Sequence, residues 1–380
     1  MTIRFALTLR AVRRRPDRSI LVALIVIVIL AAASPAAAGL FRWSRLGRLI
    51  PQTGFEPSVS VVIGHPTDPN IVYAATLRST DNTNLVFRSA DRGLTWQPAS
   101  SGLPANMPQN TGINSLLIRQ DAPNTLYAGL YRAGVWRSTD GGGNWSNATN
   151  GSIAANDTVN ALDAKPGQPN LLYALTGTGM HVSLNGGAWQ LRSSGLPDAN
   201  QTQFVDLAAD PLHPGTVYIA TNPSGIYRTE NDGQAWDAAN NGLPAGDLNV
   251  RGIAVSPLSG RVLISIAGHG LWRSDNRGTS WTRSDAGITY NTTLSGNVGI
   301  PAFSPTISGL VYVYNNDGAF TSSSNGQTWA PANEGFTGAE TVTTVSLHAA
   351  ANAVYAGTSI SGVWSLTPPV GRAFVPIVTR

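Results

Sequence analysis

The chain has 380 residues, of which 42% are apolar and only 12% are charged, with 40 Gly, 24 Pro, 10 Trp and no Cys. So little charge excludes a coiled coil or a charge-rich disordered chain, and the lack of Cys excludes a disulfide framework or a Cys-ligated metal. The formal net charge of +4 arises because six Arg and one Asp precede residue 39, which leaves 19 basic and 20 acidic residues beyond it. No positive field that would attract nucleic acid is therefore expected.

The first 38 residues have the composition of an export signal. An Arg-rich start is followed by an uncharged apolar run over 20–33 and by Ala36-Ala37-Ala38. A basic start, a short apolar run and small residues are the three parts of a secretory signal peptide, with cleavage after Ala38. The alternative is an uncleaved membrane anchor over 19–38, because about 20 residues span a bilayer. Either way, the remainder is expected to be secreted or extracytoplasmic and to touch a membrane only through this segment.

Beyond residue 39 the chain repeats one unit. Six segments follow the pattern S/T-x-D/N/S-x-G-x-x-W, and their tryptophans are spaced 44 to 49 residues apart at Trp96, Trp145, Trp189, Trp236, Trp281 and Trp329. Three short apolar segments precede each pattern, as at 113–118, 125–128 and 135–136 in the second unit. Four-stranded units at this spacing are typical of the blades of a β-propeller.

A seventh unit starts at Val342 and ends near Leu366 without the Trp pattern. Trp43 precedes Pro51 by eight residues, as Trp96 precedes Pro104, so residues 42–50 are expected to supply the missing outer strand. The alternative closing strand lies at 373–378, where Pro376 disfavours strand pairing. The sequence therefore predicts an all-β, single seven-bladed β-propeller of four-stranded antiparallel blades over 39–366. An N-terminal strand closes the last blade, and residues 367–380 form a C-terminal tail.

The repeated pattern resembles the Asp-box (BNR) repeat of sialidases, sortilin-type receptors, xyloglucanases and a photosystem II assembly factor family. The resemblance implies the propeller fold and does not by itself imply an activity. A local explanation is available: box Asp side chains accept turn N–H bonds, box Gly adopts positive φ, and the Trp packs over the turn. The box residues to which we assign this structural role are Asp91, Gly93, Trp96, Asp140, Gly142, Trp145, Asn185, Trp189, Asn231, Gly233, Trp236, Asn276, Gly278, Trp281, Gly326 and Trp329.

Catalytic residues are not evident in the sequence. The resemblance to sialidases implies an arginine cluster, a Tyr–Glu pair and an Asp, but residues 48–51 depart from the sialidase R-I-P motif and the chain has only four Glu. Xyloglucanases of this repeat type use two propellers with one carboxylate from each, whereas the sequence predicts one propeller. The five His show no metal-ligand spacing. We expect no metal and no cofactor, and leave the catalytic residues unassigned.

Ligand contacts are expected where the loops depart from the repeat. The loops that join strands two and three lie on the same face as the connections between blades. Ser60, Asn160 and Thr343 occupy one equivalent position near the starts of the first strands, together with Arg251. The ligand-binding candidates are Arg78, Asp81, Tyr131, Arg132, Asn222, Arg251, His269, Asn316 and Asp317.

These observations favour a non-enzymatic function. We predict a binding or assembly module that holds a protein or glycan partner at the cell envelope, through many weak contacts on a rigid ring. The alternative is a glycoside hydrolase of sialidase-like type, so whether the protein is an enzyme is left uncertain. No nucleic-acid partner is expected.

Overall fold

The structure is a computed structural model that describes residues 42–50, 56–78, 84–105, 107–109, 111–246, 248–289, 298–315, 317–336, 342–348 and 353–367. These residues form 28 β-strands, and their hydrogen bonds group the strands into seven sheets of four. No helix able to cross a membrane occurs in this part of the chain. The predicted signal or anchor over 1–38 lies outside the described residues, as does the tail beyond Thr367.

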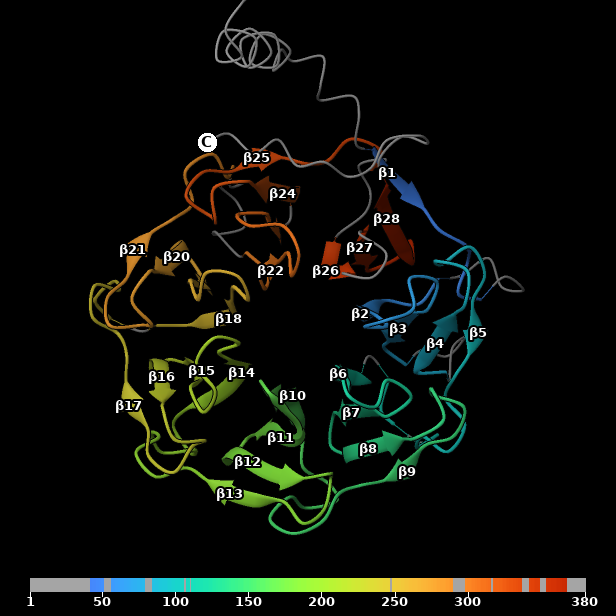
Figure 1. Cartoon of the computed structure of the whole chain (residues 1–380), viewed down its shortest axis with the longest axis horizontal. Helices are drawn as coiled ribbons and strands as arrows, with labels where there is room; N and C mark the ends of the chain where they lie inside the picture. Colours follow the sequence, from blue (N-terminus) through green and yellow to red (C-terminus); the bar gives the residue numbers. More distant parts are fainter. Residues whose placement is uncertain are drawn as a thin grey trace, which may run out of the picture. The chain divides into compact units, whose positions relative to one another are not determined.

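Six blades follow one another along the chain, each from an inner strand near the axis to an outer strand at the rim (Figure 1). Blade 1 has β2 (Val59–Gly64), β3 (Val72–Thr76), β4 (Val86–Ser89) and β5 (Gln97–Pro98); blade 2 has β6 (Ile113–Ile118), β7 (Leu126–Leu130), β8 (Gly134–Ser138) and β9 (Ser146–Asn147); blade 3 has β10 (Val159–Lys165), β11 (Gln168–Thr176), β12 (Gly179–Leu184) and β13 (Gln190–Arg192). Blade 4 has β14 (Gln203–Ala209), β15 (Val217–Asn222), β16 (Gly225–Thr229) and β17 (Asp237–Ala238); blade 5 has β18 (Val250–Val255), β19 (Val262–Ile266), β20 (Gly270–Ser274) and β21 (Thr282–Arg283); blade 6 has β22 (Ala302–Phe303), β23 (Val311–Asn315), β24 (Gly318–Ser322) and β25 (Ala330–Pro331).

Blade 7 joins the two ends of the described chain. It consists of β26 (Val342–His348), β27 (Ala353–Thr358), β28 (Val363–Thr367) and β1 (Arg42–Arg45). Strand β1 pairs antiparallel with β28, with Trp43 opposite Leu366 and Arg45 opposite Trp364. The predicted seven-bladed propeller with N-terminal closure is therefore confirmed, and β1 takes the place that the alternative closing segment at 373–378 would have needed.

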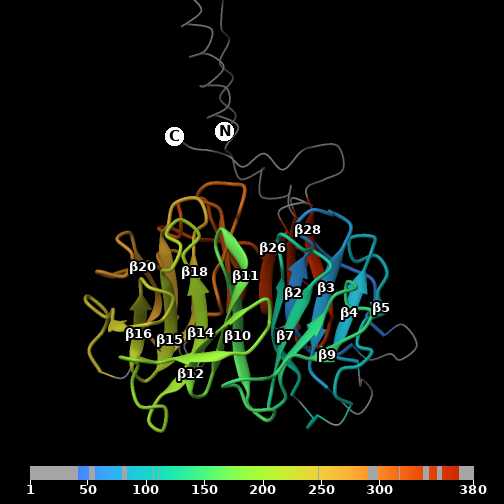
Figure 2. The same ribbon diagram turned by 60° about the horizontal axis from the view of Figure 1, so that its bottom comes forward.

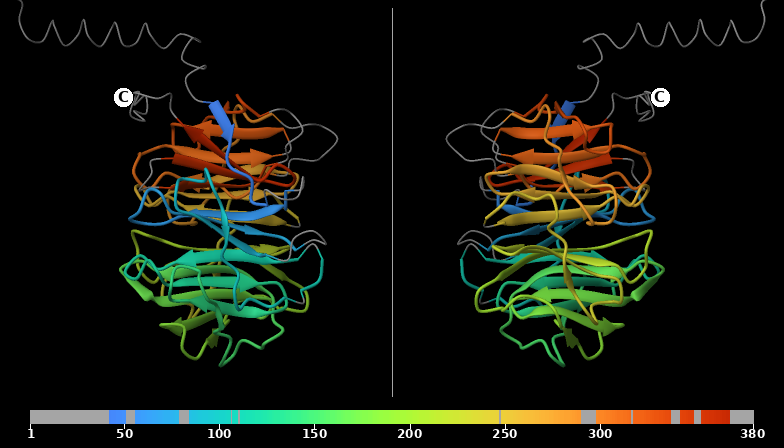
Figure 3. Two further views of the ribbon diagram at one scale, coloured as in Figure 1. Left: turned by 90° about the vertical axis from the view of Figure 1, so that its right-hand side faces the viewer. Right: turned by 90° about the vertical axis from the view of Figure 1, so that its left-hand side faces the viewer.

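The seven inner strands surround a common axis, and the short outer strands form the rim (Figure 1). In the turned view, the inner strands β10, β14 and β18 of three successive blades stand side by side (Figure 2). From the side, the strands run across the thickness of the ring (Figure 3). Because a single four-stranded sheet cannot bury both of its faces, each blade buries them against its two neighbours.

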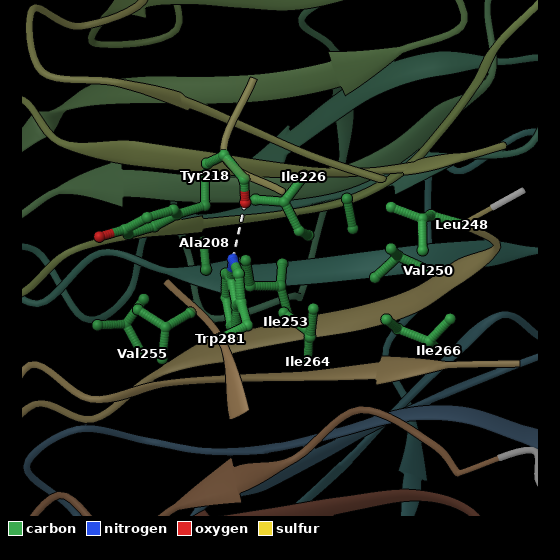
Figure 4. Packing of buried hydrophobic residues seen from close by; sticks show 13 residues of the cluster. Ala208, Tyr218, Ile226, Leu248, Val250, Ile253, Val255, Ile264, Ile266 and Trp281 are labelled. Carbon is green, nitrogen blue, oxygen red and sulfur yellow. Dashed lines mark hydrogen bonds between the residues drawn. The ribbon is translucent and has the colours of Figure 1, made fainter. Parts of the chain in front are cut away.

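The apolar core is divided into clusters between neighbouring blades. One cluster combines Tyr218 and Ile226 of blade 4 with Ile253, Ile264 and Trp281 of blade 5 (Figure 4). Each of the other six clusters likewise combines side chains from two adjacent blades. Burial of apolar side chains therefore holds the blades together as well as each blade by itself.

The box tryptophans also link the blades by hydrogen bonds. Each indole Nε1 donates to the carbonyl that lies three residues beyond the corresponding Trp of the preceding blade, in the pairs Trp43–Ala332 (2.6 Å), Trp145–Ala99 (2.8 Å), Trp189–Ala148 (3.1 Å), Trp236–Arg192 (3.0 Å), Trp281–Ala239 (2.7 Å) and Trp329–Ser284 (2.7 Å). Trp43 follows this rule although it lacks a box. The exception is Trp96, whose buried Nε1 has no partner among the described residues.

The box turns carry the hydrogen bonds that their composition suggests. In blade 1, Asp91 Oδ1 accepts the N–H of Thr95 at 2.8 Å, and Gly93 has φ 89°. Asn231 and Asn276 accept the equivalent N–H at 3.0 and 2.9 Å, so the amide oxygen substitutes for the carboxylate oxygen. Asn185 differs, because its box is one residue shorter: its φ of 56° places it at the left-handed position that follows the Asp in longer boxes.

Candidate active site around the central axis

The inner strands carry a β-bulge near their starts, and this bulge sets the side chains that meet near the axis. In four blades the side chain of the bulge residue donates a hydrogen bond to the carbonyl that precedes the bulge of the next inner strand, in the pairs Ser60–Ile113 (2.7 Å), Asn114–Val159 (3.0 Å), Asn160–Phe204 (2.6 Å) and Thr343–Val59 (2.5 Å). Blades 4 and 5 have Val205 and Arg251 at this position. Arg251 is exposed and makes no such bond, so the pattern changes there.

Two carboxylates occupy neighbouring inner strands next to this change, and we call Asp163 of β10 and Asp206 of β14 the axial carboxylate pair. Asp163 Oδ2 accepts the N–H of Ala209 at 2.9 Å, and Asp206 Oδ2 accepts the N–H of Ile253 at 3.0 Å. In both, Oδ1 accepts the N–H of the following residue. An inner strand has no neighbour on its axial edge, so these oxygens satisfy N–H groups that otherwise lack a partner.

Burial makes both members of the pair weak acids. Desolvation raises the pKa of Asp163 to about 6 and that of Asp206 to about 7, against the backbone hydrogen bonds, which lower both values. The charge of Asp163 raises the pKa of Asp206 further. Among the described residues no Lys or Arg forms an ion pair with either carboxylate. Near neutral pH, Asp206 therefore keeps its proton over a wider range than Asp163 does.

Tyr314 of blade 6 is the next polar group around the pair. Its ring lies against Gly299, where a Cβ would come within 2.0 Å of the ring. Burial raises the pKa of Tyr314 to about 12, and the negative charge of Asp206 contributes to this shift. Asp206 thus interacts electrostatically with both Asp163 and Tyr314.

A carboxylic acid that keeps its proton near pH 7 can donate it to a leaving group, and an ionised carboxylate beside it can assist a water molecule or a cationic transition state. The local structural role is also clear, because each carboxylate caps two backbone N–H groups. Metal chemistry has less support in the described part of the chain, where no group of three or more His, Asp or Glu side chains gathers.

Four of the predicted ligand residues are engaged locally. The guanidinium of Arg78 donates to the carbonyl of Met107, and its backbone N–H donates to Thr111. Tyr131 packs into the cluster between blades 1 and 2. Arg132 is exposed with φ 50°, and Asn222 Nδ2 contacts Gln203 Oε1 at 3.4 Å. None of the four is placed by these contacts at the axial carboxylate pair.

The remaining candidates divide into exposed residues and residues outside the description. Arg251, His269 and Asp317 are exposed. The carbonyl of His269 accepts the indole N–H of Trp272 at 3.1 Å, and the backbone N–H of Asp317 donates to Asn315 at 2.8 Å. Asp81 and Asn316 lie outside the described residues.

The sequence analysis missed the axial carboxylate pair. Its signal is a single Asp within an otherwise apolar inner strand, in VNALDAK for Asp163 and QFVDLAA for Asp206. The search for catalytic acids considered Glu residues and box Asp residues, and so passed over these two positions.

The fold defines this protein as a seven-bladed β-propeller, and comparisons with known proteins agree. No family model matches the chain. Among solved structures, an ancestral GH74 enzyme aligns with a TM-score of 0.61 at 18% identity over 85% of this chain and 46% of that chain. YCF48 bound to D1 peptide aligns with a TM-score of 0.61 at 14% identity over 88% and 97%. At such low identity these likenesses show the fold alone.

Curated relatives carry information about activity. A probable oligoxyloglucan-reducing end-specific xyloglucanase of Neosartorya fischeri is 28% identical over 211 residues, which are 52% of this chain and 20% of that protein. Xyloglucanase Xgh74A of Acetivibrio thermocellus is 30% identical over 209 residues, or 52% and 21%. A xyloglucanase of Paenibacillus sp is 28% identical over 57% and 20%. The chain thus spans about one fifth of the length of the curated relatives it matches.

These matches overturn the predicted function. The sequence analysis favoured a non-enzymatic binding or assembly module, and that prediction was wrong, because the relatives that match are named as xyloglucan-degrading enzymes. The stated alternative, a glycoside hydrolase, agrees better with them. The sequence analysis had looked for a Tyr–Glu pair and for paired Glu residues, and the absence of such a pattern had favoured the non-enzymatic reading.

Proposed function

We propose that this propeller is a glycoside hydrolase that acts on a polysaccharide of the xyloglucan class, with Asp206 as the general acid and Asp163 as its partner carboxylate. The observation that carries the assignment is the axial carboxylate pair: two neighbouring acids without a cationic partner, with pKa values raised to about 6 and about 7. The names of the curated relatives support the substrate class.

The two pKa values assign the roles. Asp206 is the weaker acid, so it is the member that retains a proton and donates it to the glycosidic oxygen as the C–O bond breaks. Asp163 is ionised over more of the pH range and either accepts a proton from the attacking water or stabilises the positive charge at the anomeric carbon. Both side chains are half-buried, so we expect a chain end to reach them in preference to the middle of a chain.

Two finer assignments accompany this proposal. The hydrogen bonds in the box turns support membership of the Asp-box repeat group. A polysaccharide substrate requires contact with the cell exterior, which agrees with the export signal predicted over 1–38 and with a secreted or envelope location.

The test is hydrolysis of xyloglucan and of xyloglucan oligosaccharides by the purified chain, measured by chromatography of the released sugars. Asp206→Asn and Asp163→Asn are expected to lower kcat by about 10²–10⁴, the usual contribution of general acid–base catalysis. The wild-type rate should be highest between pH 6 and 7, because Asp163 must be ionised while Asp206 must be protonated.

Two further variants distinguish a wrong location of the active site from a wrong assignment as a hydrolase. Asp237→Asn changes an exposed carboxylate on β17 and is expected to leave the rate unchanged. Asp81→Asn tests the sequence-based ligand candidate. Activity that survives Asp206→Asn but is lost in Asp81→Asn would keep the hydrolase and refute the axial site, whereas absence of turnover on every glycan would refute the hydrolase itself.

A further inference from the structure

A hollow lies between blades 1 and 2 at the box end of the strands. It has a volume of about 420 Å³ and is lined by Arg88, Ala90, Thr95, Gln97, Pro98, Ala99, Asp140, Gly141, Gly142 and Gly143. The axial carboxylate pair belongs to blades 3 and 4, so this hollow is a separate site. The register pairs Val59 with Thr76 and Val72 with Ser89, so the boxes stand at the opposite strand end from the inner-strand bulges.

Arg88, which lines this hollow, lacks the acidic partner that two of its three counterpart arginines have; the third, Arg137, has Thr139 at that box position. Arg228 pairs with Glu230 at 3.6 Å, and Arg273 pairs with Asp275 at 3.3 Å. In both boxes the acid is the second residue, and in blade 1 that residue is Ala90. Among the described residues Arg88 forms no ion pair, and its guanidinium donates a hydrogen bond to the hydroxyl of Tyr73. A cation therefore faces the hollow without its carboxylate.

The opposite wall lacks a second carboxylate that another junction has. Gly141 (φ 73°) and Asp232 (φ 56°) occupy the same left-handed box position, and each donates its backbone N–H to the loop between strands one and two of its blade. At the junction of blades 3 and 4, the carboxylate of Asp232 accepts the Tyr173 hydroxyl at 2.5 Å and Lys165 Nζ at 2.6 Å. At the junction of blades 1 and 2, Gly141 supplies no side chain at this position.

The equivalent tyrosine is still present in the hollow. The hydroxyl of Tyr73 donates to the carbonyl of Gly141 at 3.0 Å, and a Cβ at Gly141 would lie 3.5 Å from that hydroxyl. The hollow thus has an arginine and a tyrosine hydroxyl, but neither the box acid that pairs with Arg228 and Arg273 in their blades nor an acid at the position of Asp232.

From this double omission we propose that the hollow binds the carboxylate of a uronic-acid unit of a glycan. Arg88 pairs with the carboxylate, and the side chains of Thr95 and Gln97 offer hydrogen bonds to sugar hydroxyls. The volume is within the range of small-molecule sites. The site extends the proposed function to acidic branches of a polysaccharide, but binding is measured without turnover and stands or falls independently of hydrolysis.

Asp140 is the one acidic residue that lines the hollow, and it provides a further test of the proposal. Its Oδ1 accepts Ser138 Oγ at 2.8 Å and the N–H of Asn144 at 2.9 Å, and its Oδ2 accepts Asn144 Nδ2 at 2.9 Å. The carboxylate is therefore directed into its own turn. Its charge still opposes a bound anion, so Asp140→Asn is expected to tighten carboxylate binding, and Asn231 shows that Asn maintains this turn.

The experiment is titration of the full chain with D-glucuronate and with D-glucose, followed by calorimetry or by NMR shifts of the Trp and Gly signals. Glucuronate is expected to bind at least tenfold more tightly than glucose and more tightly than acetate, which has a carboxylate without the sugar. Gly141→Asp places the missing carboxylate in the hollow and should abolish binding while it preserves the thermal unfolding midpoint. Arg88→Gln should also abolish binding.

Matched variants complete the test. Arg228→Gln changes the equivalent arginine at another junction and is expected to leave glucuronate binding unchanged, whereas Asp140→Asn should tighten it several-fold. Equal binding of glucose and glucuronate, full binding by a folded Gly141→Asp variant, or weaker binding by Asp140→Asn would each refute the proposal. Equal binding of acetate, or tighter binding of an acidic peptide, would refute the assignment to a sugar.

Discussion

At the residue scale, buried ionisable groups near the axis and between blades set opposite pH dependences. The raised pKa of Asp206 means that the folded state holds a proton that the unfolded state has already lost. Its contribution to stability is complete below pH 4 and is lost as the pH rises through about 7. His181 behaves in the opposite way, because desolvation lowers its pKa to about 4 and its ring nitrogens contact Ser152 and Thr176.

We expect Asp206→Asn to change the pH dependence of stability. The wild type should lose stability relative to the variant between about pH 4 and pH 7, since in this range its unfolded state releases the Asp206 proton that its folded state holds. Each unit of pKa shift corresponds to about 1.4 kcal/mol, so the difference between their unfolding midpoints should move by several degrees across this range. Thermal unfolding followed by circular dichroism measures it, and a difference that stays constant with pH contradicts the burial argument.

The same measurement on His181→Gln supplies the opposite sign. The imidazole is buried as the neutral form, so the wild type must lose stability as the pH falls from 6.5 towards 4. The variant has no proton to bind and should flatten this acid limb. A variant that follows the wild-type acid limb would show that His181 is not the titrating group.

At the scale of the element, each blade is attached to its neighbour by the indole bond of a box Trp. The exception at Trp96 offers a matched comparison. Trp281→Phe removes the 2.7 Å bond to Ala239 and leaves that carbonyl buried, which should cost about 1–3 kcal/mol beyond the loss of ring size. Trp96→Phe removes a donor without a partner among the described residues and should cost less. Urea unfolding of both variants gives the difference, and equal losses would show that the indole bonds contribute nothing.

The repeat predicted much of this architecture, since the spacing of the tryptophans set the blade number and Trp43 identified the closing strand. What the repeat could not predict is which residue of one blade meets which residue of the next. The hydrogen bonds from Tyr73 to Gly141 and from Ala209 to Asp163 join residues that are 68 and 46 positions apart. Such contacts depend on the rotation between blades, which no local pattern encodes.

The candidate site was missed for the same reason. Asp163 and Asp206 each look like an isolated polar residue in an apolar strand, and only the closed ring brings β10 and β14 together. The loop candidates were chosen by their departure from the repeat, which is a sound guide to variation but not to ionisation. The raised pKa values of Asp163 and Asp206 come from burial by neighbouring blades, and this burial exists only in the assembled ring.

At the scale of the whole molecule, the stability of the ring depends on the blade that both ends share. Trp43 is 1% exposed, stacks on Phe336 with ring centroids 5.0 Å apart and bonds to Ala332. Glu56, also buried, pairs with Arg45 at 3.1 Å and accepts the N–H of Leu49 at 3.2 Å. These contacts fix the closing strand to the blades on both sides.

Trp43→Ala is therefore expected to destabilise the whole fold by about 3–5 kcal/mol, the usual cost of removing a buried aromatic side chain. The unpaired edge of β28 would become available for association with other chains, so the variant should also aggregate at its unfolding midpoint. Arg42→Ala, at an exposed position of the same strand, is the control. Unfolding and light scattering test both effects, and a loss below 1 kcal/mol would show that β1 is dispensable.

The meeting of both ends in blade 7 also bears on how the gene could be rearranged. Because Arg42 lies opposite Thr367, a short linker could join them, and new termini could be opened in a turn inside any other blade. Such a circular permutant would retain all seven sheets and would differ only in which blade is closed by two separate segments. Which blade contains both chain ends is then determined by the order in which the gene encodes the strands, and not by the structure of the ring.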